Sequence, residues 1–181
     1  MAFDIETLDA LPPDAFIAAT SPWFEGAPRF LARLAAARPF GSAEALFARA
    51  EAIALGMPDA EQVELIDAHP RLGASPATVS AASFREQGYD RETTVAIAEH
   101  DRLNVIYEQQ FGFRFCVFVN GRSRAALVPV LEAALDGQRA EELGRALRDV
   151  VAIARDRWSK ADAVLPGDAA PDAATLARAG R

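Results

Sequence analysis

The chain has 181 residues, of which 51% are hydrophobic and 25% are charged, and its formal net charge at pH 7 is −7. That length suits one domain with a substantial core, and the composition is that of a globular protein. Because an acidic chain repels phosphate backbones and anionic lipid headgroups, nucleic acids and membrane surfaces are disfavoured as partners.

Alanine and leucine supply much of the hydrophobic content, whereas β-branched residues are sparse outside one short stretch. This balance favours helices, so we predict an all-α fold, an irregular single-domain bundle of about eight helices. No uncharged apolar stretch approaches the ~20 residues that a membrane helix needs. The start of the chain is acidic, whereas a signal peptide begins with basic residues, so we expect a cytoplasmic protein.

Prolines mark the ends of the first predicted helices. Pro12 and Pro13 favour a short helix over residues 15–19, because a proline in the first helical turn sacrifices no hydrogen bond. A second helix is predicted over residues 28–36, and Pro39 lies just beyond its end.

Capping and breaking residues define the next two helices. The hydroxyl of Ser42 predicts an N-cap for a third helix that reaches about residue 55. A fourth helix is expected over residues 60–68. It ends at His69, because a residue that precedes a proline, here Pro70, resists the α conformation.

The middle of the chain combines helical and extended patterns. A weak helical stretch is expected at residues 77–87, and the longest helix is predicted over residues 91–110. Residues 111–119 read Phe-Gly-Phe-Arg-Phe-Cys-Val-Phe-Val, which alone is typical of a strand. The chain offers no obvious partner strand, so we expect a buried extended segment.

Two more helices complete the predicted domain, which covers residues 1–158. Ser123 caps a helix to about residue 135, and the last strong helix, residues 140–158, has an apolar stripe along one side. Residues 159–181 are rich in alanine, aspartate and proline, and we expect a frayed helix or a tail there.

The chain has two histidines, and only one of them stands at a predicted helix end. His100 lies in mid-helix among charged residues, so a solvated helix face accounts for it. At His69, the unpaired carbonyls of the helix C-terminus favour the imidazolium form. Two interpretations of His69 stay open, a structural His-Pro cap and an imidazole that exchanges a proton with a substrate.

Ser83, Glu86 and Gln87 form a Ser-x-x-Glu-Gln motif. This pattern is that of a capping box, in which the serine bonds the backbone and the glutamate reaches back. The same side chains could hold a substrate, and the two roles do not exclude each other.

Arg157 lies at the edge of the last apolar stripe, so its guanidinium must pair with something anionic. The partner is either an acidic side chain of this protein or an oxygen of a substrate. Cys116 is the only cysteine, and we interpret it as a small core residue. With two histidines and one cysteine, a zinc site would need mostly carboxylates, so we expect no metal.

Several segments are individually weak signals but occur in a characteristic order. They are Trp23-Phe24-Glu25, Arg38-Pro39-Phe40, His69-Pro70-Arg71-Leu72-Gly73, Ser83-x-x-Glu86-Gln87, Asn104-x-x-Tyr107-x-x-x-Phe111-Gly112-Phe113-x-Phe115, and Ile153-Ala154 followed by Arg157. In this order the segments resemble the 2-oxo-4-hydroxy-4-carboxy-5-ureidoimidazoline (OHCU) decarboxylase family.

The resemblance implies an all-helical enzyme that converts the ureidoimidazoline to (S)-allantoin and CO₂ in urate breakdown, without a metal or organic cofactor. It implies that His69 and Glu86 are catalytic. It also implies substrate contacts, some of them through backbone amides, from Pro70, Ser83, Gln87, Phe115, Val117, Val119 and Arg157. The resemblance also implies a homodimer, because relatives in the family are often dimers.

Two other functions stay open at this point. One is a lyase that acts on a related ureide or hydantoin acid, and the other is a catalytically silent helical domain that binds a partner. A buried cluster of His69, Glu86 and Arg157 favours an enzyme, because an interaction module needs no such cluster. We therefore predict that these three side chains converge on one pocket.

Overall fold

The computed structural model describes residues 4–73 and 94–163 of the chain. Within these ranges the regular structure is helical throughout, which confirms the predicted all-α class. The helices are α1 (Ile5–Ala10), α2 (Pro13–Thr20), the short 3-10 helix η1 (Ser21–Trp23), α3 (Pro28–Ala36), α4 (Ala43–Gly56), α5 (Asp59–Asp67), α7 (Thr94–Phe111), α8 (Arg124–Ala134) and α9 (Arg139–Ala163).

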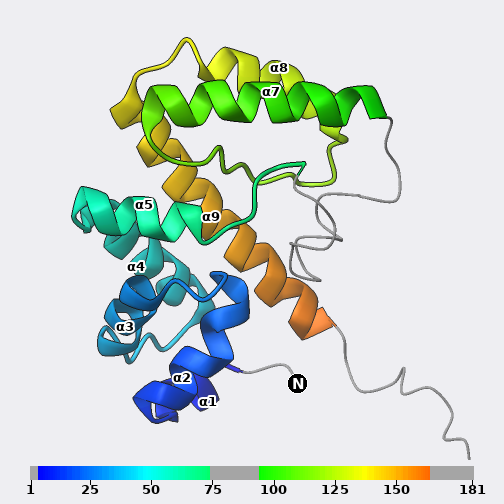
Figure 1. Ribbon diagram of the computed structural model, residues 1–181. Helices are drawn as coiled ribbons and strands as arrows, with labels where there is room; N and C mark the ends of the chain where they lie inside the picture. Colours follow the sequence, from blue (N-terminus) through cyan, green and yellow to red (C-terminus); the bar gives the residue numbers. More distant parts are fainter. Residues whose placement is uncertain (1–3, 74–93, 164–181) are drawn as a thin grey trace, which may run out of the picture.

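Helix α9 connects the two ends of the molecule. It crosses the fold diagonally, from the side of the α7–α8 pair to the layer that α2, α3 and α4 form (Figure 1). Along this path α9 packs against α4, α5 and η1, whereas α7 and α8 pack against each other. The predicted apolar stripe of α9 is buried, as expected, and consists of Leu143, Leu147, Val150, Val151 and Ala154.

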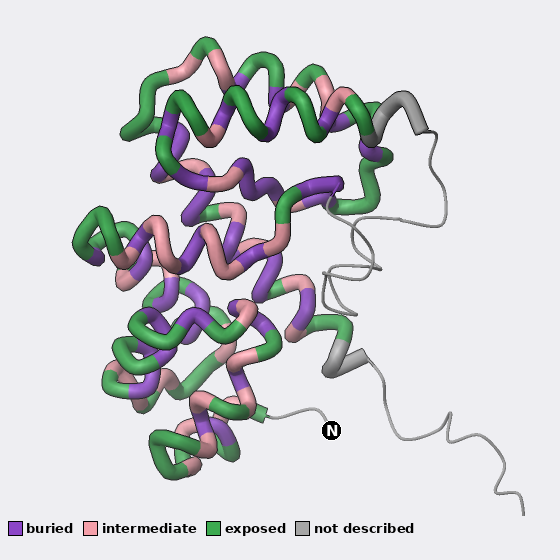
Figure 2. The backbone as a smooth tube through the Cα atoms, in the orientation of Figure 1, coloured by how far each residue is buried: buried purple, intermediate pink, exposed green. Residues whose placement is uncertain are grey.

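Buried residues follow the inward faces of the helices and the extended segment that leaves α7 (Figure 2). This segment, residues 112–119, is held by an aromatic cluster around Tyr107. The Tyr107 ring centre lies 4.5 Å, 5.7 Å and 5.2 Å from those of Phe111, Phe113 and Phe115, respectively. Burial of such rings contributes roughly 1.5–3 kcal/mol each. The prediction of a buried extended segment is therefore confirmed.

Some helix predictions were wrong. Helix α1 was not predicted, although Asp4 caps it by accepting a hydrogen bond of 2.7 Å from the N–H of Thr7. Helix α9, with 25 residues, is longer than α7, with 18, so residues 91–110 do not form the longest helix. Helix α9 also extends to Ala163, into residues 159–181, for which a frayed helix was one of the two predictions. The predicted helical stretch 77–87 and the tail beyond residue 163 lie outside the described residues.

The prediction of a solvated helix face for His100 was also wrong. This side chain is completely buried, and its Nε2 lies 2.8 Å from the backbone carbonyl of Arg124. The charged neighbours Glu99, Asp101 and Arg102 suggested an exposed position. Successive residues of an α-helix are rotated by about 100° around its axis, so His100 faces inward while Asp101 and Arg102 face solvent.

The N-cap of α4 offers a test of the fold prediction. Ser42 Oγ accepts a hydrogen bond of 3.1 Å from the N–H of Ala45, as the sequence predicted. We expect Ser42→Ala to lower the free energy of unfolding by about 1 kcal/mol, because a helix N–H loses its partner. Urea denaturation measures this change. An unchanged midpoint and slope would show that the cap contributes nothing.

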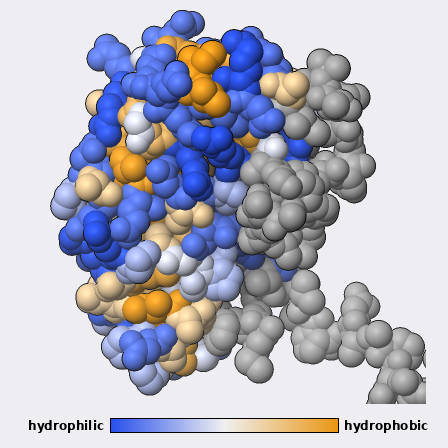
Figure 3. Space-filling view, in the orientation of Figure 1, coloured by the Kyte–Doolittle hydropathy of each residue, from blue (hydrophilic) through white to orange (hydrophobic). Residues whose placement is uncertain are grey.

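The face of the molecule in Figure 3 is mainly hydrophilic, with hydrophobic residues in small separate patches. Among the described residues, the exposed large hydrophobic side chains are Leu55, Val105 and Ile106. None of the described helices has the length and hydropathy needed to span a bilayer.

Candidate active site

A cavity of about 170 Å³ lies where the end of α5, the extended segment and the last turns of α9 meet. It is the junction of three elements that are far apart in the sequence. Its walls comprise His69, Pro70 and Leu72 after α5, residues 115–121 of the extended segment and the following turn, and Ile153, Asp156, Arg157 and Lys160 of α9.

His69 is the buried imidazole of this cavity, with a residue exposure of 4%. Its Nδ1 lies 3.2 Å from the backbone carbonyl of Leu65. A carbonyl oxygen only accepts hydrogen bonds, so Nδ1 carries the hydrogen in the neutral ring and Nε2 keeps a lone pair. Nε2 is buried and has no hydrogen-bond partner within residues 4–73 and 94–163.

The surroundings of His69 keep its imidazole neutral. Burial, together with the positive charge of Arg157, lowers the pKa of His69 to about 4, and the carboxylate of Glu25 and the carbonyl of Leu65 oppose this shift only in part. The expected stabilisation of the imidazolium by the end of α5 is therefore outweighed by loss of solvent. At neutral pH the ring is uncharged, and its free Nε2 is a base.

Arg157 has an acidic partner within the chain, which was one of its two predicted alternatives. Its Nη2 lies 2.8 Å from Oε1 of Glu25, and both side chains are largely buried. Nη1 of Arg157 also donates to the backbone carbonyl of Pro22, at 2.9 Å. Glu25 lies in a tight turn with a φ of 50°, followed by Gly26 with a φ of 77°. This turn aims the carboxylate at α9.

Arg114, in the extended segment, forms hydrogen bonds with the end of α5. Its backbone N–H donates to Oδ1 of Asp67, at 2.9 Å, and its Nη1 donates to the carbonyls of Asp67 and His69, at 2.6 Å and 3.0 Å. The guanidinium therefore holds the backbone of the histidine itself. Because both walls of the cavity are tied by one side chain, their relative position is fixed.

The structure brings together six of the nine predicted site residues. The cavity is lined by His69, Pro70, Phe115, Val117, Val119 and Arg157. Ser83, Glu86 and Gln87 lie outside the described residues, so their place in the site stays a prediction. Sequence reasoning missed Glu25, although it belongs to the Trp-Phe-Glu segment, and it missed Asp67 and Arg114, whose polar side chains interrupt apolar runs.

Comparison with known proteins shows the family of this chain. The sequence model of the OHCU decarboxylase family matches residues 9–159. The chain belongs to the OHCU decarboxylase family. It is 27% identical to the 2-oxo-4-hydroxy-4-carboxy-5-ureidoimidazoline decarboxylase of Haloferax volcanii, over 86% of this chain and 94% of that protein. It is also 34% identical to the uric acid degradation bifunctional protein PucL of Bacillus subtilis, over 74% of this chain.

This chain spans only 28% of the length of PucL, so the match concerns one part of that bifunctional protein. Among solved structures, the fold is similar to that of an OHCU decarboxylase crystallised in the presence of (S)-allantoin. The TM-score is 0.66 at 21% identity, over 80% of this chain and 97% of the other. A crystal structure of (S)-allantoin synthase gives a TM-score of 0.64 at 20% identity, over 87% of this chain and 54% of the other. These structural similarities show that this chain has the fold of the OHCU decarboxylases.

Proposed function

We propose that this protein decarboxylates OHCU to (S)-allantoin and CO₂. Membership of the OHCU decarboxylase family supports this function. The observation that carries it is the lone pair on Nε2 of His69, buried without a described partner in the wall of a cavity that Arg157 also lines. A neutral base beside a fixed cation suits a reaction that moves one proton and forms an anion.

The reaction needs few chemical groups. The bond between the ring carbon and the carboxylate breaks, CO₂ leaves, and the electron pair stays on the ring as an enolate-like anion. The hydroxyl group then loses its proton to become a carbonyl, a neighbouring ring carbon gains a proton, and one further proton from solvent neutralises the charge that the departing CO₂ left behind. Nε2 of His69 starts without a proton, so it can take the hydroxyl proton and deliver one to carbon. Delivery from one wall of a cavity produces one enantiomer.

The developing anion needs oriented donors. Preorganised N–H groups around such a charge contribute roughly 2.7–4 kcal/mol each, by analogy with oxyanion holes. The segment 115–119 and Arg157 line the cavity, and we assign the backbone amides of Val117 and Val119 and the guanidinium of Arg157 as these donors. Pro70 and Phe115 provide apolar walls that exclude water. We further assign Ser83, Glu86 and Gln87 to the ureido end of the substrate, with Glu86 either orienting His69 or accepting ureido N–H groups.

The pKa of His69 predicts the acidic limb of the pH profile. The neutral ring is the active form, so kcat/KM should be constant from neutral pH to about pH 5 and fall about tenfold per pH unit below about 4, as the ring gains a proton. Rates measured with freshly generated substrate over pH 3–8 give this profile. A limb centred near 6.5, the value of an unperturbed histidine, would contradict the assignment.

The proposed function is tested by following circular dichroism while urate is oxidised and hydrolysed in situ in the presence of the protein. We expect optically active allantoin to accumulate faster than the racemic background. A catalytically silent binding domain would leave the racemic product unchanged. A lyase for a different ureide acid would also leave it unchanged, but would release CO₂ from that acid.

The family resemblance also supports a homodimer, and we expect the protein to act in the cytoplasm. Light scattering coupled to size-exclusion chromatography tests the assembly, since a dimer has twice the chain mass of 19.4 kDa. A species with the mass of one chain at micromolar concentration would contradict it.

A further inference from the structure

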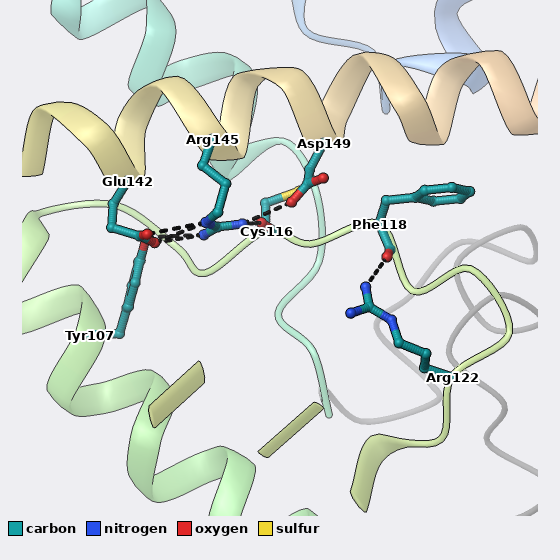
Figure 4. A network of polar contacts seen from close by, with 7 residues as sticks. All are labelled: Tyr107, Cys116, Phe118, Arg122, Glu142, Arg145 and Asp149. Atoms are coloured by element: carbon teal, nitrogen blue, oxygen red, sulfur yellow. Dashed lines mark hydrogen bonds and ion pairs between the residues drawn. The ribbon is translucent and has the colours of Figure 1, made fainter. Parts of the chain in front are cut away.

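The segment 115–119 forms a wall of the cavity without belonging to a sheet, so side chains must satisfy its backbone polar groups. Two arginines do this (Figure 4). Nη1 of Arg145, from α9, donates to the carbonyl of Cys116 at 2.9 Å. Nη2 of Arg122, from the turn that follows, donates to the carbonyl of Phe118 at 2.5 Å.

These carbonyls belong to the peptide groups that precede Val117 and Val119. Because a peptide bond is planar and trans, its C=O and N–H point in opposite directions. The hydrogen bond that holds the carbonyl of Cys116 toward Arg145 therefore directs the N–H of Val117 away from Arg145. In the same way, the hydrogen bond from Arg122 to the carbonyl of Phe118 directs the N–H of Val119 away from Arg122. Both valines line the cavity, and neither of their N–H groups donates to another described residue.

Arg145 is itself held rigidly. Its Nη2 lies 2.8 Å from Oε2 of Glu142, and its Nη1 lies 2.8 Å from Oδ2 of Asp149, one turn further along α9. The hydroxyl of Tyr107 donates to the same Oε2 of Glu142, at 2.9 Å. The guanidinium also stacks over the ring of Phe115, 4.9 Å from its centre. Because both Nη groups of Arg145 are hydrogen-bonded and its guanidinium lies over a ring, this side chain has little rotational freedom.

Electrostatics strengthen this arrangement. Burial raises the pKa of Asp149. The charge of Arg145 and a hydrogen bond from the backbone N–H of Phe118 favour the carboxylate and offset this rise only in part. Arg145 keeps its proton, because the neighbouring carboxylates, Glu142 first, offset its burial and raise its pKa. A permanent cation between two acidic groups thus points at one carbonyl of the cavity wall.

We propose that Arg145 and Arg122 are positioning residues of the decarboxylase, which orient the N–H groups of Val117 and Val119 toward the enolate-like anion. This inference rests on the proposed function. Neither arginine lines the cavity. Arg145 acts through the carbonyl of Cys116, and Arg122 acts through the carbonyls of Phe118 and Val119, the latter at 3.0 Å from its Nε. Loss of either arginine should therefore disturb stabilisation of the transition state more than binding of the ground state.

Arg139 provides a matched control. It also forms a two-pronged ion pair, with Asp59 at 2.6 Å and 3.0 Å, and donates to a backbone carbonyl, that of Phe111, at 2.9 Å. Its guanidinium lies over Phe113, 5.6 Å from the ring centre. Arg139 therefore makes the same kinds of contact as Arg145, but the backbone carbonyl that it binds lies outside the cavity.

The test compares Arg145→Gln, Arg122→Gln and Arg139→Gln by kcat and KM for OHCU and by amide hydrogen exchange. We expect kcat to fall about 10- to 100-fold in Arg145→Gln, and by a smaller factor of at least about threefold in Arg122→Gln, with KM changed less than about threefold. Exchange at Val117 should accelerate in Arg145→Gln. Arg139→Gln should keep kcat within about twofold.

Should Arg145→Gln fail to fold, Arg122→Gln decides the question, because Arg122 is exposed on the surface. A kcat within twofold of wild type in both cavity-wall variants, or an equal loss in Arg139→Gln, would overturn the positioning role. If the wild-type protein itself makes no allantoin, the proposed function fails. In that case, an unchanged rate of amide exchange at Val117 in Arg145→Gln would still show that Arg145 does not orient the peptide group between Cys116 and Val117, whatever the substrate is.

Discussion

Replacing His69 with asparagine should lower kcat for OHCU by about 10²- to 10⁴-fold, the usual contribution of general acid–base catalysis. Asparagine has a similar size and can donate a hydrogen bond to the carbonyl of Leu65, as Nδ1 of His69 does. It cannot take up a proton at neutral pH. Stopped-flow circular dichroism of freshly generated substrate measures the rate and the chirality of the product together.

His100 supplies the control for this substitution, because it is the other histidine and is also buried against a backbone carbonyl. We expect His100→Asn to lower stability while its folded fraction keeps a wild-type kcat. A His69→Asn protein that produces (S)-allantoin at the wild-type rate would refute the catalytic role of His69.

Replacing Arg157 with glutamine should affect catalysis, stability and the pKa of His69. The carboxylate of Glu25 would remain buried without its cation, and breaking a buried pair in this way costs about 3–5 kcal/mol. The charge of Arg157 lowers the pKa of His69 and that of Glu25 raises it, so the substitution should move this pKa upward. Titration of His69 by NMR and chemical denaturation measure the two effects.

Two companion variants make the Arg157 prediction specific. Glu25→Gln should move the pKa of His69 in the opposite direction, downward, because only the lowering charge remains. Arg155 lies on the exposed side of the same helix, over the ring of Phe47, and Arg155→Gln should leave both the pKa of His69 and kcat unchanged. A pKa of His69 that falls in Arg157→Gln would contradict the electrostatic account.

Local signals in the sequence predicted most helix boundaries correctly. Pro28 begins α3, and Ser42 and Ser123 cap α4 and α8, because these residues act on neighbouring backbone groups. Helix α1 escaped prediction, since it has six residues and buries only Leu8. The extra turn of α9 contains no breaking residue, and Lys160 supports it with an ion pair to Asp156.

The candidate site was predictable only in part, because its contacts are long-range. The ordered motifs grouped His69, Arg157 and residues 115–119 as site residues, and these residues line one cavity in the structure. No sequence spacing could pair Arg157 with Glu25, which lies 132 positions earlier in the chain. The sign of the pKa shift of His69 was missed for the same reason. The end of a helix is visible in a sequence, but the depth of burial depends on the whole fold.

The most direct test of the central claim is a crystal structure of this protein with (S)-allantoin bound. We predict that the ureide occupies the cavity between α5 and α9, with Nε2 of His69 about 3–3.5 Å from the ring carbon that gains the proton. The N–H groups of Val117 and Val119 should face its ring oxygen. Allantoin bound elsewhere, or an imidazole whose Nε2 is turned away from that carbon, would contradict the account.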